Sequence, residues 1–351
     1  MKICIVVGTR PQIIKSHPLI KALNSRKIDL TIIHTGQHFD YEMSKSFFDE
    51  LKIQEPDVNL GIKNGSGSEQ LGQIILKLEK PLKKINPDFV LVPGDTRSAL
   101  GAALSAFRLG YKIGHIEAGA RSNDFTLEEE INRRIIDNCS SLLFAPTKNC
   151  YMNLKKECIL GSMYVTGDTM YDVFLEYQKI LNLNKPRKRK FVLMTIHRKN
   201  NIENRKQISK IIQLARKISQ SGIEVIFPIH PHTKKQIKSF GISLNNINTV
   251  SPVRYSRMLE LLSEGKLLIT DSGGLQKEAY WSNTPCVTIR PSTEWIETLN
   301  GKHNLLLDKI TSSSFKKIEK ILSSPPLKLK PTKFGNGTAS KKISSILIQN
   351  F

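Results

Sequence analysis

The sequence predicts an α/β protein made of two Rossmann-like, doubly wound domains. Short, continuously apolar runs alternate with helical patterns along the chain, and such runs are typical of parallel strands covered by helices on both faces. The chain has 351 residues, and domains usually run to about 100–200 residues, so two domains is the natural count. A polar and basic stretch at 182–190 separates the strands and helices of the first half from those of the second half, and it is typical of a linker.

The same alternation places the individual elements. We expect strands of the first domain at 3–7, 30–34, 89–92, 113–116, 142–144 and 164–166, and its helices at 11–23, 41–51, 68–84, 98–109, 128–139 and 147–157. We expect strands of the second domain at 191–196, 224–229, 249–250, 267–270 and 286–289, and its helices at 202–220, 233–240, 255–263 and 274–281. The first domain then covers 1–166 and the second covers 167–337. Two such domains facing each other would form a cleft, and ligands bind these sheets beyond the carboxyl ends of the strands.

Composition argues against several classes of protein. The 53 Lys and Arg residues exceed the 31 Asp and Glu residues, but no helix-turn-helix, zinc-finger or RNP pattern accompanies the net charge of +22. We interpret the excess as a lysine-rich surface that attracts anionic ligands, and expect no nucleic-acid partner. The five cysteines form no C-x-x-C pair, which argues against a disulfide framework or a metal site. No apolar run approaches the ~20 residues of a membrane span. The chain starts like a first strand rather than a signal peptide, so we expect a cytoplasmic protein.

Cationic residues follow the first expected strand. Arg10 lies at the start of a helix, where backbone N–H groups and the helix dipole favour anions, and Pro11 suits the first helical turn. Lys15 lies one turn further along the same helix. The turn is not G-x-G-x-x-G, so nothing in it supports binding of a nicotinamide dinucleotide.

Carboxylates follow two other strands of the first domain. Asp95 comes after the strand at 89–92, and Glu117 comes directly after the strand at 113–116. Glu129 then lies between two further glutamates at the start of the helix at 128–139. Carboxylates in a first helical turn are commonly partners of the helix dipole, so the pattern alone favours a structural role for this group over a catalytic one.

Two histidines and a glycine-rich turn follow strands of the second domain. His197 and His230 end two of its strands, without the spacing of a metal site. The turn Ser272-Gly273-Gly274 leads from a strand into a helix. Glycines let a backbone approach a phosphate closely, and successive N–H groups with a hydroxyl can hold a diphosphate. Glu278 follows one turn later, where it could accept hydrogen bonds from ribose hydroxyls.

These residues together resemble the non-hydrolysing UDP-N-acetylglucosamine 2-epimerases, in order and over essentially the whole chain. The shared motifs are Gly8-Thr9-Arg10-Pro11, Gln37-His38, Pro93-Gly94-Asp95-Thr96, 115–119, 129–133, His197-Arg198, 228–231, 270–278, Arg290 with 293–297, and 334–340. The resemblance implies two Rossmann-like domains with an interdomain cleft, similar to the B-type glycosyltransferase fold, with a C-terminal helix at 338–351 returning to the first domain. It also implies a homodimer that uses no metal and no cofactor.

The resemblance implies how the reaction proceeds. The C2 proton is removed and UDP is expelled from C1, a 2-acetamidoglycal and UDP stay bound, and the proton then returns to the other face of C2. Inversion needs proton exchange on both faces, which is why more than one carboxylate is useful. By resemblance, Asp95, Glu117 and Glu129 are acid/base groups and His197 is catalytic. The substrate-binding residues are Arg10, Lys15, Arg133, His230, Tyr255, Ser272, Gly273, Gly274 and Glu278.

The resemblance leaves the sugar open. The default reaction converts UDP-GlcNAc to UDP-ManNAc. Many relatives have Arg where this chain has Trp295, and the run Thr293-Glu294-Trp295-Ile296-Glu297, together with Gln12, is similar to the branch acting on UDP-2,3-diacetamido-glucuronate for surface polysaccharide. The alternative from another class is a glycosyltransferase on the same scaffold, which would require an acceptor.

Overall fold

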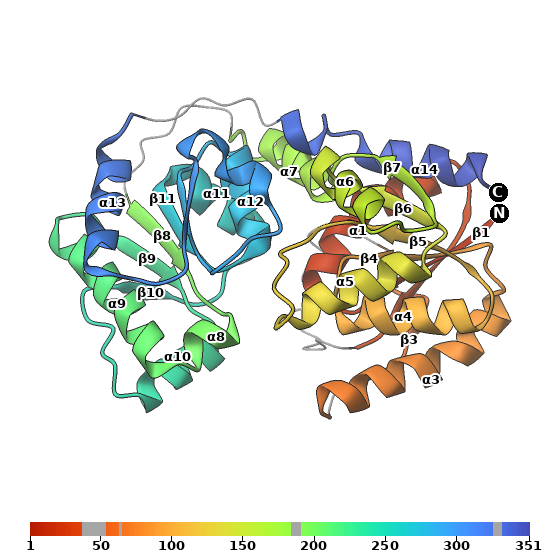
Figure 1. Cartoon of the computed structure of the whole chain (residues 1–351), viewed down its shortest axis with the longest axis horizontal. Helices are drawn as coiled ribbons and strands as arrows, with labels where there is room; N and C mark the ends of the chain where they lie inside the picture. Colours follow the sequence, from red (N-terminus) through yellow and green to blue (C-terminus); the bar gives the residue numbers. More distant parts are fainter. Residues whose placement is uncertain (37–53, 63–64, 184–190, 326–331) are drawn as a thin grey trace. The chain divides into compact units, whose positions relative to one another are not determined.

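The computed structural model describes residues 1–36, 54–62, 65–183, 191–325 and 332–351. The chain divides into two compact units (Figure 1). Unit 1 comprises Met1–Leu175 with Thr332–Phe351, and unit 2 comprises Glu176–Pro331. The expected helix at 41–51, the motif at 37–38 and most of the expected linker lie outside the described residues.

Unit 1 extends past the expected boundary at 166 and ends at Leu175. The reason lies in helix α7 (Thr169–Ile180), whose first turn is bonded to the C-terminal segment. The carboxylate of Asp172 accepts the first two backbone N–H groups of α14 (Ala339–Gln349), at 3.1 and 2.8 Å. The division therefore falls within α7 rather than before it.

Unit 1 is built on a seven-stranded parallel sheet in the order β3-β2-β1-β4-β5-β6-β7. Its strands are β1 (Lys2–Val7), β2 (Asp29–His34), β3 (Val58–Asn59), β4 (Phe89–Pro93), β5 (Lys112–Ile116), β6 (Leu142–Ala145) and β7 (Ser162–Val165). Before α7 and α14, its helices are α1 (Arg10–Asn24), α3 (Gly67–Ile85), α4 (Arg97–Arg108), α5 (Glu128–Cys139) and α6 (Lys148–Lys156). Helices cover both faces of the sheet, which is why every residue of β4 is buried (Figure 1).

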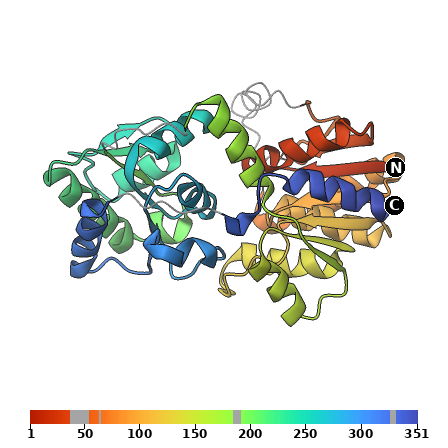
Figure 2. The ribbon, with the colours of Figure 1, turned by 90° about the horizontal axis from the view of Figure 1, so that it is seen from above.

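The C-terminal helix belongs to unit 1. It runs beside α1, as Figure 2 shows for the blue and red helices next to the two chain ends. Arg26, just past the end of α1, donates a hydrogen bond of 2.7 Å to the Ser345 hydroxyl on α14. On its inner face α14 buries Ile343 and Leu347 completely. The C-terminal helix is thereby packed against α1 as part of unit 1.

Unit 2 is built on a six-stranded parallel sheet in the order β10-β9-β8-β11-β12-β13. Its strands are β8 (Phe191–Thr195), β9 (Val225–Pro228), β10 (Asn248–Val250), β11 (Gly265–Thr270), β12 (Cys286–Ile289) and β13 (Asn304–Leu307). Its helices are α8 (Lys199–Ile202), α9 (Arg205–Gln220), α10 (Pro231–Ser239), α11 (Tyr255–Glu264), α12 (Gly273–Trp281) and α13 (Ser312–Ser323), with a 3₁₀ segment at Ile296–Lys302. The expected single helix at 202–220 is wrong at its start, because the Asn204 side chain accepts the Gln207 N–H at 3.1 Å and caps α9 there.

The two sheets share one strand order, in which the chain first runs outward in one direction and then crosses back. The order therefore reverses between β1 and β4 in unit 1, and between β8 and β11 in unit 2. This is the doubly wound order in which ligands bind at the reversal point, beyond the carboxyl ends of the strands. The predicted fold class, two Rossmann-like doubly wound domains, is confirmed. Across the described ranges, we find no helix of the length and apolar character needed to cross a bilayer.

One buried histidine in this fold gives a pH prediction. His34 at the end of β2 is 2% exposed, and burial lowers its pKa to about 4. In the unfolded chain His34 binds its proton with a pKa near 6.5, whereas in the folded chain it does so with a pKa of about 4. Between these values the unfolded state binds more protons, so His34 makes the protein less stable as the pH falls from 6.5 to 4. His34→Asn keeps an acceptor for the Gly36 N–H, which donates to the His34 ring at 3.1 Å, but does not titrate. Urea unfolding between pH 7 and 4.5 should show a shallower loss of stability in the variant, and parallel pH dependences would contradict the assignment.

Candidate active site

The turn after β1 is tied to the end of β4 by one side chain. Gln12 on α1 accepts hydrogen bonds from the backbone N–H groups of Gly8 and Thr9, at 2.9 and 3.1 Å. Its amide donates to the Pro93 carbonyl at 2.8 Å. Arg10 is the first residue of α1, as the sequence predicts. Gln12 therefore fixes this helix start at the reversal point of the sheet.

Lys15, Glu117 and the backbone of Gly94 meet at the carboxyl ends of β4 and β5. The Lys15 ammonium is paired with the Glu117 carboxylate, and their side chains are only 14% and 15% exposed. Gly94 has a φ of +73°, which favours glycine, and a Cβ atom there would lie only 3.0 Å from the Lys15 ammonium. Glu117 itself has a φ of +78°, a conformation that is uncommon for a residue with a side chain. Such backbone conformations are concentrated at functional sites.

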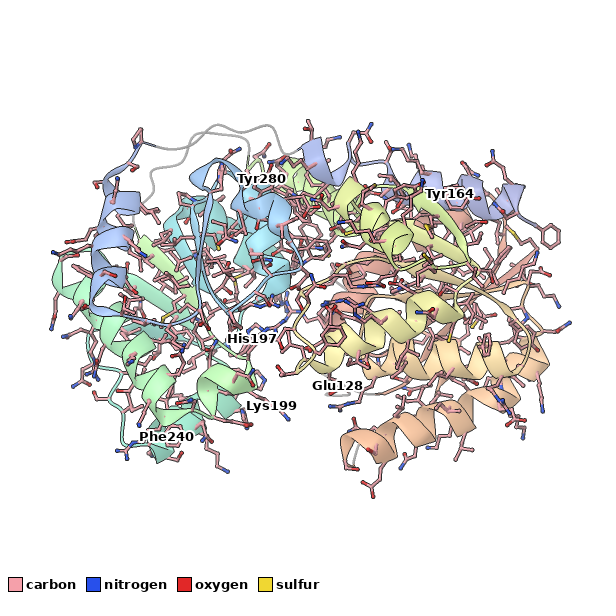
Figure 3. The ribbon with its side chains drawn as sticks, in the orientation of Figure 1. Glu128, Tyr164, His197, Lys199, Phe240 and Tyr280 are labelled. Carbon is pink, nitrogen blue, oxygen red and sulfur yellow. The ribbon has the colours of Figure 1, made fainter. Side chains whose placement is uncertain are left out.

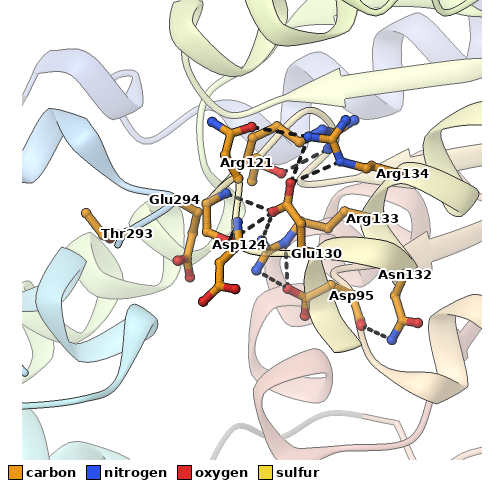
Figure 4. Close-up of polar contacts among 12 residues, drawn as sticks. Asp95, Arg121, Asp124, Glu130, Asn132, Arg133, Arg134, Thr293 and Glu294 are labelled. Atoms are coloured by element: carbon orange, nitrogen blue, oxygen red, sulfur yellow. Dashed lines mark hydrogen bonds and ion pairs between the residues drawn. The ribbon is translucent and has the colours of Figure 1, made fainter. Parts of the chain in front are cut away.

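Asp95 is held by a buried arginine. The Arg133 guanidinium approaches one Asp95 carboxylate oxygen with Nε at 2.8 Å and Nη2 at 2.7 Å, and it also lies 3.2 Å from Glu130 (Figure 4). The Asn132 amide donates to the Asp95 carbonyl at 2.8 Å. The Asp95 side chain is 29% exposed, whereas that of Arg133 is 5% exposed. Arg133, predicted as a substrate-binding residue, is placed by the structure against a candidate catalytic carboxylate.

The three consecutive glutamates of α5 have different environments. Glu130 is fully buried and accepts hydrogen bonds from Ser122 and Arg134, with the shortest at 2.8 Å (Figure 4). Glu128 is exposed and pairs with both nitrogens of one edge of Arg97, at 2.6 and 2.9 Å. Glu129 is half-buried, and its carboxylate has neither a hydrogen bond nor an ion pair within the described residues. Of the three, Glu129 is therefore the one that acts on the described residues through its charge alone, which is felt by Arg97.

In unit 2, His197 follows β8 and is oriented by a buried aspartate. Asp271 is fully buried, and its carboxylate accepts the backbone N–H groups of His197 and Arg198 at 3.1 and 2.9 Å. The His197 Nδ1 atom lies 3.3 Å from the same carboxylate, and 52% of the His197 side chain is exposed. Figure 3 shows His197 beyond the end of β8, close to Lys199 at the start of α8. The Nε2 side of the ring is thus available to a ligand.

The glycine-rich turn follows β11, the strand next to β8. Ser272 caps α12, with its hydroxyl accepting the Leu275 N–H at 3.3 Å. A Cβ atom at Gly273 would lie 2.4 Å from a Glu294 carboxylate oxygen, so only glycine leaves space here. Glu294 is paired with Arg290 at 2.7 Å, and both side chains are almost completely buried. The first N–H groups of a helix have no partner within it, which makes this turn a suitable place for an anion.

The remaining predicted binding residues lie in different settings. Glu278 on α12 is 3% exposed. Tyr255 opens α11 and is 5% exposed, with its ring edge-on to Tyr177 at 5.2 Å between centroids. His230 is exposed and caps α10 by accepting the His232 N–H at 3.3 Å. Their predicted contacts with a substrate stay predictions.

Trp295 is part of a buried stack in unit 2. It is 3% exposed, and the ammonium of Lys277 lies 3.9 Å from its ring centroid. Lys277 is also 3% exposed and is 5.8 Å from the ring of Trp281. A cation above an aromatic face is stabilising, more so when both groups are desolvated. The stack therefore holds the loop that carries Glu294 against α12.

The structure thus gathers the predicted residues at the two reversal points. Unit 1 brings Lys15, Asp95 and Glu117 to the ends of β1, β4 and β5, and unit 2 brings His197 and Ser272 to the ends of β8 and β11. Sequence patterns missed Asp271 as the residue that orients His197, although it stands directly before Ser272. No group of three or more His, Cys, Asp or Glu side chains in the described part of the chain is placed to hold a metal ion.

Two doubly wound units, with paired carboxylates at one reversal point and a glycine-rich turn at the other, define an α/β enzyme of the B-type glycosyltransferase fold class. The family model for UDP-N-acetylglucosamine 2-epimerase matches residues 21–348, and the chain belongs to this family. The predicted enzyme class is confirmed: the chain is an isomerase of the non-hydrolysing UDP-N-acetylhexosamine 2-epimerase type.

Individual relatives match along their whole length. The chain is 42% identical over 362 residues to a UDP-N-acetylglucosamine 2-epimerase of Methanococcus maripaludis, covering 99% of this chain and 98% of that one. It is 36% identical to the UDP-2,3-diacetamido-2,3-dideoxy-D-glucuronate 2-epimerase of Pseudomonas aeruginosa, covering 99% of each. The crystal structure of the Methanocaldococcus jannaschii UDP-GlcNAc 2-epimerase in complex with UDP-GlcNAc and UDP superposes with a TM-score of 0.92 at 38% identity, covering 99% of this chain and 100% of that one.

Proposed function

We propose that this enzyme inverts C2 of a UDP-2-acetamido sugar, with UDP-GlcNAc and UDP-ManNAc as its default substrate pair. The observation that carries the proposal is the meeting of two cation-paired carboxylates, Asp95 and Glu117, at the ends of neighbouring strands. A proton must leave one face of C2 and return to the other, and two differently placed carboxylates are suited to that exchange. Glu129, whose carboxylate makes no bond within the described residues, is a third candidate for it.

The reaction proceeds by elimination and re-addition. A C2–H bond beside an acetamido group is a very weak acid, but breaking the C1–O bond builds positive charge at C1 and acidifies C2–H. One carboxylate takes the C2 proton as UDP leaves with the electron pair of the C1–O bond, giving a 2-acetamidoglycal. A second carboxylate then delivers a proton to the opposite face of C2, and the UDP oxygen adds back to C1. Lys15 and Arg133 hold Glu117 and Asp95 in place for these transfers.

Departing UDP needs stabilisation of its charge. We assign this role to Arg10, to His197 through its Nε2 side, and to the turn Ser272-Gly273-Gly274. Groups that are already oriented toward developing charge contribute a large share of many rate enhancements. The Asp271 carboxylate fixes His197, and Asp271 directly precedes the turn in the chain, so one buried residue connects both elements. We also propose a cytoplasmic homodimer, which light scattering on the purified protein would test for its oligomeric state.

A second substrate is favoured by one specific observation. The Lys277 ammonium lies over the Trp295 ring, in the loop that carries Glu294. The run of sequence at 293–297, which contains both Glu294 and Trp295, is similar to the branch that acts on UDP-2,3-diacetamido-glucuronate. The 36% identity to the P. aeruginosa enzyme is compatible with this alternative. The matching family model is that of an epimerase, and it gives the glycosyltransferase alternative no support.

The test is a two-substrate exchange assay. The protein is incubated in deuterated water with UDP-GlcNAc or with UDP-2,3-diacetamido-glucuronate, and C2 is observed by NMR. We expect deuterium at C2 and a C2-inverted product with one of the two sugars, without any acceptor. Absence of both signals with both sugars would refute the proposed function, and release of UDP only when an acceptor is added would restore the glycosyltransferase alternative.

A further inference from the structure

A histidine and an aspartate form a buried pair beneath the candidate carboxylates of unit 1. His115 on β5 and Asp137 on α5 are both completely buried. The His115 Nδ1 atom lies 2.6 Å from one Asp137 carboxylate oxygen, and the His115 Nε2 atom lies 3.0 Å from the Gly94 carbonyl oxygen. The second Asp137 oxygen accepts the Arg121 guanidinium at 2.6 Å and the Gly119 N–H at 3.2 Å. Every polar atom of the pair therefore has a partner.

The hydrogen-bond partners indicate which atoms of the pair donate and which accept. Burial raises the pKa of Asp137, but the charge and hydrogen bond of His115, followed by those of Arg121, outweigh it and place the pKa below its usual range. Asp137 is then an acceptor, and so is the Gly94 carbonyl. Each ring nitrogen of His115 therefore lies against an acceptor, so the ring is placed to donate both to a carboxylate and to a peptide carbonyl.

Each bond of the pair ends on a loop that carries a candidate catalytic group. Gly94 directly precedes Asp95, and a Cβ atom at Gly94 would lie 3.0 Å from the Lys15 ammonium and 3.7 Å from the Glu117 carboxylate. Gly119, which Asp137 binds, follows Glu117 by two positions. The pair thus holds the loops after β4 and β5 in one arrangement, although it touches neither candidate carboxylate itself.

We propose that His115 and Asp137 are positioning residues for the C2 proton transfers, acting through the Gly94 and Gly119 peptides on Asp95 and Glu117; this inference rests on the proposed function. A purely structural role does not explain the pair well. Replacing a buried ion pair by apolar residues of similar volume often leaves the stability of a protein unchanged or increases it. What the pair adds is a fixed orientation of the groups that it binds. The donating Nε2–H fixes the orientation of the Gly94 peptide, and a misplacement of about 1 Å near reacting groups can cost about 100-fold in rate.

The experiment compares Asp137→Asn and His115→Gln with a matched control, Asp172→Asn. Asp172 is another carboxylate of unit 1 with backbone N–H partners, but those partners belong to α14. At a fixed interval below each melting temperature, we expect the two test variants to lose about 10–100-fold in kcat for C2 exchange, with KM changed less than about threefold. The control should lose stability and keep its kcat. His115→Gln retains one N–H donor and should therefore lose less than His115→Leu.

A second measurement observes the hydrogen bonding of the His115–Asp137 pair directly and does not depend on enzyme activity. ¹⁵N NMR of the wild-type imidazole should show both His115 nitrogens protonated, and Asp137→Asn should convert the ring to a single neutral tautomer. Wild-type exchange together with full kcat in Asp137→Asn, or a neutral His115 in the wild type, would overturn the positioning role alone. If the wild-type protein exchanged no deuterium with either sugar, the proposed function would fail, and the positioning role with it.

Discussion

Asp95→Asn should lower kcat for C2 exchange by about 10²–10⁴-fold, the range typical of a lost general acid or base. Asparagine has the shape of aspartate and its oxygen still accepts the Arg133 guanidinium, which lies 2.7 Å from Asp95, so the local structure should survive. Asparagine takes up no proton at neutral pH. Because the stabilisation of UDP is assigned to Arg10, His197 and the turn Ser272-Gly273-Gly274, and not to Asp95, the Kd for UDP should change less than about threefold. The measurement is deuterium exchange at C2 beside calorimetric titration with UDP.

The control for this variant lies at the opposite end of the same strand. Asp88 directly precedes β4 at its amino end and accepts the Lys2 N–H at 2.6 Å, whereas Asp95 follows the carboxyl end of β4. Asp88→Asn removes the same charge from the other end of β4, away from the candidate site, so it should leave kcat unchanged. Equal loss of turnover and of UDP affinity in Asp95→Asn would mean that Asp95 has a structural role only.

How far the sequence could predict this structure depends on how local each signal is. Strands such as β4 and β8, buried at every residue, are continuously apolar and were correctly expected. Strand β3 has only two residues, one half-buried and one exposed, so it has no such apolar pattern and was not expected. Strand β13 and helix α13 were also missed, although α13 carries an apolar face and buries Ile318. The division within α7 could not be read at all, because it depends on bonds from Asp172 to residues 339 and 340.

The site shows the same distinction. Asp95, Glu117, His197 and Ser272 were found by a local rule, namely that functional residues follow strands in doubly wound sheets. The three glutamates of α5 look alike in sequence, and only the facing of the helix separates the buried Glu130 from Glu129. Buried polar pairs are harder still. Asp137 is a polar residue in a polar helix until the fold places His115, 22 positions earlier, at 2.6 Å from it.

Asp271→Asn should have the largest effect in unit 2, and it should act on both stability and turnover. The Asp271 carboxylate accepts the N–H groups of His197 and Arg198 and the Asn201 amide at 2.9 Å. An asparagine amide would direct its own N–H groups at one or more of these donors, leaving buried polar groups unsatisfied at a cost of about 1–3 kcal/mol. Since the same carboxylate orients the His197 ring, we expect kcat/KM to fall by about 100-fold as well.

Thr195→Val separates the two effects. The Thr195 hydroxyl shares a hydrogen bond of 2.7 Å with Thr270 between β8 and β11, the strands that carry His197 and Asp271. Valine removes that buried bond at a cost in the same range, about 1–3 kcal/mol, without changing any partner of Asp271. Urea unfolding should therefore show comparable losses in the two variants, while only Asp271→Asn loses kcat/KM. Equal kcat/KM in both variants at equal stability would mean that the carboxylate supports the sheet and does not orient His197 for the leaving UDP.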